Sequence, residues 1–164
     1  MQVIRRLLLL LIITLLGFHV TSIAQQAKAE LKDLTSGADV IITGKVTQQT
    51  SSWNEDKSRI YTLATVQVDE YLKGNSSGNT VTIKYLGGEV DDIGEIYSHM
   101  PRLEDKEEVL LFLKKDNKTT DYKVYDGENG KIRIVQDPKT GEKITTSNVR
   151  INSLKSQIKT FTKE

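Results

Sequence analysis

The stretch IYTLATVQVDEYLK, residues 60–73, decides the fold of this 164-residue chain. Its side chains alternate between two faces, as they do in a β-strand. The first face carries mainly apolar residues: Ile60, Ala64, Val66, Val68 and Leu72. The other face carries Tyr61, Leu63, Thr65, Gln67, Asp69 and Tyr71. Strands usually span about 3–10 residues, so a longer one must coil or bend, as the strands of small closed barrels do.

Further strands are expected on both sides of this one. Residues 40–49 precede it, and Gly44 within them indicates a bulge or a tight bend. Residues 80–86 follow it, after a turn rich in Gly, Asn and Ser. Residues 108–114 are a continuous apolar run, typical of a strand buried on both faces. Two weak strands, expected to pair as a hairpin, complete the set: residues 122–125 and 131–135.

The segments between and outside the strands are predicted to be loops and two helices. A polar hairpin loop is predicted over 50–59. Residues 89–107 form a connection of a length typical of functional or mobile loops, with a short strand over 93–97 as an option. Helices are predicted over 27–36, ending at Gly37 as at a C-cap, and from about Asn152. The order predicts a mainly β fold, a small five- to six-stranded Greek-key barrel of OB type with a short N-terminal and a C-terminal helix. A sandwich of two sheets is the alternative.

The N-terminus has the features of a secretory signal peptide. Arg5 and Arg6 precede the apolar run 7–16, and Ser22 and Ala24 are small residues at the positions that a signal peptidase reads. We therefore predict a signal over residues 1–24 and a single domain over 25–164. The mature protein is expected to be exported, soluble, periplasmic or extracellular, and without a membrane span.

Composition excludes several classes of partner and stabilisation. The chain has no cysteine, so no disulfide can form and the core alone must stabilise an exported domain. Its net charge is only +1, which predicts neither nucleic-acid binding nor a polybasic membrane patch.

Several short stretches together resemble the netrin-like module, the OB-fold of the tissue inhibitors of metalloproteinases. The resemblance rests on ADVIITGKV (38–46), VQVDEYLKG (66–74) and EEVLLFL (107–113). An uncharacterised group of exported bacterial proteins with this layout is more similar still, through Trp53, Ile60-Tyr61-Thr62, Leu72-Lys73-Gly74, Gly87-Gly88-Glu89-Val90, Pro101-Arg102-Leu103 and Gly130-Lys131. The resemblance covers about residues 30–160. It implies the fold, an exported context and a protease as a conceivable partner. Inhibitors of this fold bind the protease zinc through an N-terminal cysteine, which this chain lacks.

The sequence offers little for catalysis or metal binding. His99 is the one histidine outside the predicted signal, and no nucleophile motif accompanies it, so we predict a non-enzymatic protein. A hydrolase or metal-dependent enzyme centred on His99 is the least favoured alternative. Four carboxylates, Glu89, Asp91, Asp92 and Glu95, lie in the same connection. We interpret them as a solvated acidic loop rather than a cation site, and expect no metal and no cofactor.

The remaining hypothesis is binding through the 50–59 loop and the 87–107 segment. An exposed loop tryptophan is a natural anchor, although Trp53 could instead fold back and fill one end of the barrel. The predicted contact residues are Trp53, Asn54, Tyr61, Glu89, Asp92, Tyr97 and His99. The leading hypothesis is a protein–protein interaction with an unknown extracytoplasmic protein. The alternative is carbohydrate or small-ligand binding through Trp53 and the tyrosines, Tyr85 included.

Overall fold

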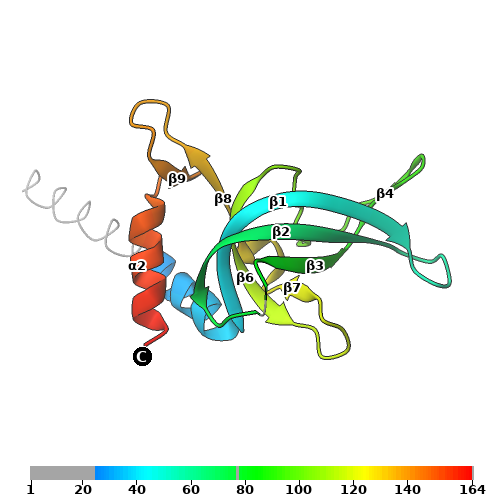
Figure 1. Ribbon diagram of the computed structural model, residues 1–164, viewed down its shortest axis with the longest axis horizontal. Coiled ribbons are helices and arrows are strands. Elements are labelled where there is room, and N and C mark those ends of the chain that lie inside the picture. The colour runs from blue at the N-terminus through cyan, green and yellow to red at the C-terminus, as the bar shows by residue number, and fades with distance from the viewer. Residues whose placement is uncertain (1–24, 77, 164) are drawn as a thin grey trace, which may run out of the picture. The chain divides into compact units, whose positions relative to one another are not determined.

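A computed structural model of the chain describes residues 25–76 and 78–163 (Figure 1). The predicted signal peptide, residues 1–24, lies outside the described residues. The chain divides into two compact units with the boundary between Asp33 and Leu34, and the second unit contains all the strands of the described part. No helix among the described residues is long and apolar enough to cross a membrane.

Five strands close into a barrel, which confirms the predicted OB-like Greek key. The strands are β1 (Val40–Trp53), β2 (Ile60–Lys73), β3 (Thr80–Leu86), β6 (Glu108–Lys115) and β7 (Tyr122–Val124). The first three form an antiparallel meander, β3 runs parallel to β7, and β7 pairs with β6. Because β6 also pairs with β1, the sheet closes on itself instead of forming a sandwich.

The bend predicted at Gly44 is present and allows β1 to serve two neighbours. Residues 41–45 of β1 pair with β2 on one side and with β6 on the other. The register with β2 shifts between Thr43 and Gly44, as at a β-bulge. A Cβ atom at Gly44 would overlap the backbone carbonyl of Gln67, so a larger residue would prevent this close approach.

The long strand β2 has the bounds that the sequence predicts, and its inner face is as predicted over its first half. Ile60, Ala64 and Val66 are fully buried. The alternation predicts Tyr71 on the outer face, and that prediction is wrong, because Tyr71 packs against the barrel core. The pairing passes from Gly44–Val68 to Thr43–Glu70, so one residue of β2 is skipped and the alternation of faces changes there. A strict period of two cannot show such a bulge.

Two loop predictions need correction. The polar segment 50–59 is not all loop, because β1 continues to Trp53, which pairs with Ile60, and only residues 54–59 connect the strands. The connection 89–107 begins inside a small hairpin, formed by β4 (Gly88–Val90) and β5 (Ile93–Glu95).

The predicted hairpin between 122–125 and 131–135 does not form. The strand β7 pairs with the C-terminal half of β6, while β8 (Lys131–Gln136) pairs with its N-terminal half. A 3-10 turn, η1 (Gly127–Gly130), separates them. A further strand that the sequence pattern does not predict, β9 (Lys143–Thr145), pairs with β8 at the edge of the sheet.

Helix α2 (Ile151–Phe161) confirms the predicted C-terminal helix and lies against β2 and β9. Its apolar stripe is buried at Ile151, Leu154 and Ile158. Lys155 and Lys159 both pair with Glu70 of β2, with Nζ–carboxylate distances of 2.9 and 2.6 Å. These two ammonium groups hold the pKa of Glu70 below its usual value.

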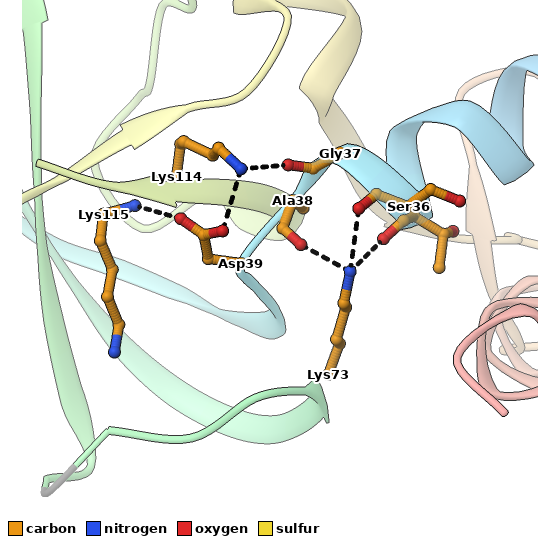
Figure 2. Close-up of polar contacts among 8 residues, drawn as sticks. Ser36, Gly37, Ala38, Asp39, Lys73, Lys114 and Lys115 are labelled. Carbon is orange, nitrogen blue, oxygen red and sulfur yellow. Dashed lines mark hydrogen bonds and ion pairs between the residues drawn. The ribbon is translucent and has the colours of Figure 1, made fainter.

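The N-terminal helix covers residues 25–37, and its last carbonyl groups are capped by side chains from the barrel (Figure 2). Lys73 Nζ donates to the carbonyl groups of Thr35 and Ala38 at 2.7 and 2.6 Å. Lys114 Nζ donates to the carbonyl of Gly37 at 2.8 Å and pairs with Asp39. Cationic side chains are favourable at this end of a helix because its carbonyl groups carry partial negative charge.

Gly37 ends the helix for a reason that differs from the predicted C-cap. Its φ lies outside the left-handed region, so the chain does not need glycine for that conformation. A Cβ atom there would instead overlap the ring of Tyr125, which follows β7. The glycine therefore allows the end of the helix and the barrel to approach closely.

We predict that Gly37→Ala lowers the free energy of unfolding by about 1–3 kcal/mol, the usual cost of overpacking. Urea denaturation measures the effect. In a Tyr125→Ala background the same substitution should cost almost nothing, because the overlap is gone. An equal cost in both backgrounds would contradict the packing explanation.

Candidate functional site

The candidate site is the mouth of the barrel, where β1 and β2 extend beyond the closed part. Past Lys45, β1 no longer pairs with β6, and it continues to Trp53 with β2 alone as its strand partner. The β4–β5 hairpin contacts both strands of this two-stranded arm. Residues 96–107 then lead back to β6. We call these three parts, the arm, the hairpin and residues 96–107, the mouth.

Gly87 and Gly88 bring the hairpin onto the arm. Their φ angles are +100° and +137°, which side chains with a Cβ rarely adopt. The Gly87 carbonyl accepts a hydrogen bond from Thr62 Oγ1 at 2.7 Å, and Ser51 Oγ lies 2.9 Å from the same Thr62 oxygen. A Cβ atom at Gly88 would overlap both hydroxyl groups. Glycine is therefore required here by both conformation and space.

Glu95 fastens the end of the hairpin to the start of β2. Its Oε2 accepts hydrogen bonds from the Ile60 N–H at 2.9 Å and from the Tyr97 hydroxyl at 2.8 Å. The Arg59 guanidinium lies over the Tyr97 ring, 5.7 Å from its centroid. The Ile60 N–H, followed by the Tyr97 hydroxyl, lowers the pKa of Glu95 from its usual value, while the same carboxylate raises the pKa of Tyr97.

Residues 96–107 are irregular but anchored. Pro101 and Leu103 are buried, and so is the carboxylate of Glu107, whose side chain is only 1% exposed. Glu107 Oε1 pairs with Lys131 Nζ at 2.9 Å, and its Oε2 accepts the Glu104 N–H at 3.0 Å. Lys131 also donates to the carbonyl of Arg102. A buried ion pair of this kind is costly to break, so it fixes the segment to β8.

Two cavities lie on either side of Met100 and Pro101. The first, about 280 Å³, lies between the hairpin and the arm and includes Ser51, Thr62, Glu95 and Arg102 in its wall. The second, about 370 Å³, is more apolar and lies between β3 and the segment around β7. Tyr61 and Lys84 border it, with the ammonium group 4.8 Å from the ring centroid.

The structure brings some of the predicted site residues together and separates others. Trp53 is half-buried at the end of β1 and pairs with Ile60. The Ile60 N–H and the Tyr97 hydroxyl both donate to Glu95, so Trp53 and Tyr97 lie in the same part of the mouth. Glu89 borders the first cavity beside Tyr97, whereas Tyr61 borders the second. Asp92 is exposed in the turn of the hairpin.

Asn54 and His99 have local roles in the backbone. Asn54 Oδ1 accepts the N–H groups of Ser58 and Arg59 at 2.9 and 3.0 Å, which shapes the tip of the β1–β2 hairpin. His99 is exposed, has a φ of 64°, and its carbonyl accepts the Glu128 N–H at 3.0 Å. A buried His99 against a carboxylate would favour the hydrolase alternative, and His99 is exposed in this structure. Within residues 25–76 and 78–163, no three acidic or histidine side chains form a group that could hold a metal ion.

Several residues that shape the mouth escape prediction from sequence. The pattern marks Glu95 only as part of an acidic loop, and it does not single out Ser51, Thr62, Arg102 or Glu107. The Gly87-Gly88 pair was an available signal, because consecutive glycines often mark a close approach of two backbones. The partners of Glu95 and Glu107 are distant in sequence, so no local pattern could reveal them.

No protein-family model matches the chain, and no curated protein matches its sequence.

We predict that Tyr97→Phe raises the pKa of Glu95, because one of the two hydrogen bonds that stabilise the carboxylate is lost. In the parent protein, the stability contributed by the ionised Glu95 carboxylate is fully present above the pKa that Glu95 has in the unfolded chain. It is lost as the pH falls through the lower pKa that Glu95 has in the folded protein. An NMR titration of the Glu95 side-chain carboxyl carbon measures the pKa in parent and variant. Tyr61→Phe is the matched control and should leave the Glu95 pKa unchanged. An unshifted pKa in Tyr97→Phe would show that the hydroxyl does not stabilise the carboxylate.

Proposed function

We propose that the protein is an exported, non-enzymatic module that binds another protein through its β4–β5 hairpin. The observation that carries the proposal is the exposure of two large apolar side chains on this hairpin and just after it. Ile93 is 53% exposed and Ile96 is 74% exposed. A neighbouring surface that covers them would gain the burial of their apolar area, about 25 cal/mol per Å².

The hairpin is suited to binding because it is already fixed in place. Glu95 binds the backbone of β2, and the two glycines seat the hairpin on Ser51 and Thr62. A preorganised binding element loses little conformational entropy when the complex forms. The two isoleucines are therefore presented at small entropic cost.

Charge around the hairpin indicates the kind of partner. Residues 85–101 contain four carboxylates and no Lys or Arg. Three of them, Glu89, Asp91 and Asp92, are exposed. Exposed carboxylates around an apolar tip favour a partner that has an apolar contact patch with a basic rim. The cations at the mouth are outside this range: Arg59 lies over Tyr97 and Arg102 borders the first cavity. The resemblance to netrin-like modules adds a secreted protease as a candidate partner, by a mechanism that cannot use an N-terminal cysteine.

A capture experiment tests the proposal. The tagged protein is incubated with envelope and secreted fractions of the cells that produce it, beside an Ile93→Ser/Ile96→Ser variant. We expect a partner that the parent enriches and the variant does not. With the purified partner, we expect the variant to bind at least about tenfold more weakly, since two apolar contacts are lost. The affinity should also fall with added salt because the acidic rim is screened.

Val149→Ser is the matched control, because Val149 is 41% exposed and lies outside the mouth, next to α2. It should bind as the parent does. Partner binding that survives in the double variant would overturn the assignment of the hairpin as the docking surface. Failure of the parent to bind any protein would overturn the proposed function itself.

A further inference from the structure

The first cavity has features of a small-molecule site, and of the two exposed isoleucines only Ile96 borders it. It lies at the mouth of the barrel, between the arm and the hairpin, and measures about 280 Å³. Ligand pockets commonly range from about 300 to 1,000 Å³, so this one suits a single ring rather than a larger molecule. Barrel mouths are among the usual places for such pockets.

Groups of both charges in the cavity wall have no partner in the described part of the chain. Arg102 contributes a guanidinium group that forms no hydrogen bond or ion pair with a described residue, although its backbone carbonyl is bound by Lys131. Glu89 likewise forms no side-chain hydrogen bond or ion pair with a described residue. Both Glu89 and Arg102 are exposed residues, so water solvates their charged groups in the free protein. Glu95 uses only Oε2 in its two hydrogen bonds, which leaves Oε1 free to accept another. The wall therefore offers five donors on one side chain and carboxylate acceptors on two others.

The remaining wall is apolar or aromatic. Leu103 and Pro101 are buried residues of the segment 96–107, and the half-buried Tyr85 lies near the end of β3. The Tyr85 hydroxyl is already bound to Gln49 Oε1 at 2.8 Å, and burial raises the pKa of Tyr85. The Tyr85 ring, which packs against the barrel core, contributes aromatic surface to the cavity wall.

This combination selects among ligand classes. A small anion has no donor for the Glu89 and Glu95 carboxylates, and a small cation without oxygen atoms has no acceptor for the Arg102 guanidinium, so neither satisfies all three groups. A neutral molecule with many hydroxyl groups can donate to the carboxylates and accept from the guanidinium at once. If it also has a ring with an apolar face, that face can lie on Tyr85 and Leu103. A pyranose sugar has both properties.

We propose that the mouth cavity binds one neutral, polyhydroxylated ring, namely a sugar residue. Glu89, Glu95 and Arg102 hydrogen-bond its hydroxyl groups. This site differs from the predicted aromatic surface around Trp53 and Tyr61, which do not border the cavity. It adjoins the docking surface, because Ile96 borders the cavity whereas Ile93 does not.

Titrations with ¹⁵N-labelled protein test the site. The probes are D-glucose, D-galactose, D-mannose and N-acetyl-D-glucosamine, with L-arginine and citrate as charged comparisons. We expect at least one sugar to shift the amide signals of Gly87, Gly88 and Gly94 saturably, and neither charged probe to do so. Arg102→Gln should weaken this binding about tenfold or more, because a charged donor is lost. Arg150→Gln, which changes an exposed arginine beside α2, is the matched control.

The outcomes separate this proposal from the protein-binding function. Sugar binding should persist in an Ile93→Ser variant, because Ile93 does not border the cavity, and it should not require the captured partner. Glycosides and oligosaccharides of the sugar that binds distinguish a free sugar from the end of a glycan, because only a glycan site binds the longer ligand more tightly. Absence of saturable shifts with all four sugars would overturn the proposal, as would unchanged affinity in Arg102→Gln or stronger binding of a charged probe. A captured protein partner would be unaffected by these results.

Discussion

The structure depends on the double pairing of β1. Residues 41–45 are bonded to β2 and to β6 at the same time, which closes the barrel. Gly44 makes this possible because β2 approaches too closely there for any side chain. Closure uses only the first part of β1, so the rest of the strand projects with β2 as an arm. The mouth exists because β1 and β2 extend beyond the closed barrel that they help to form.

Long-range polar contacts, more than regular secondary structure, hold the mouth in place. The Thr62 hydroxyl, itself in contact with Ser51 Oγ, donates to the Gly87 carbonyl. Glu95 accepts a hydrogen bond from the backbone of β2, and Glu107 forms an ion pair with Lys131. Each contact joins segments that are distant in sequence. The carboxylate of Glu107 is buried, and without Lys131 its remaining ion pair would be the longer one with Arg133 Nε at 3.7 Å. Losing Lys131 is therefore expected to be costly. A fixed mouth can present both an exposed apolar hairpin and a polar cavity beneath it.

Much of the barrel could be predicted from sequence, and little of the mouth. The bounds of β2 and β3 followed from alternation between polar and apolar residues, and β6 followed from its unbroken apolar run. The face of Tyr71 could not be predicted, because a bulge leaves no mark in the alternation. The separate pairing of β7 and β8 with β6 could not be predicted, because the turn-forming residues between these two strands are typical of a hairpin connection. Tyr97 and Glu89 could be predicted at the site from their residue types. Glu95 and Arg102 could not, because their roles depend on residues that only the fold brings close to them.

The central claim is that the mouth is preorganised, and amide hydrogen exchange tests it most directly. The Lys106 N–H donates to the Val46 carbonyl at 2.9 Å, and the Glu104 N–H to Glu107 at 3.0 Å. The account predicts that these amides exchange within about tenfold of the rate of amides in the closed part of the barrel, such as Ile42, which pairs with both β2 and β6. Exchange of the Glu104 and Lys106 amides at the rate of an unstructured peptide, while Ile42 remains protected, would contradict it.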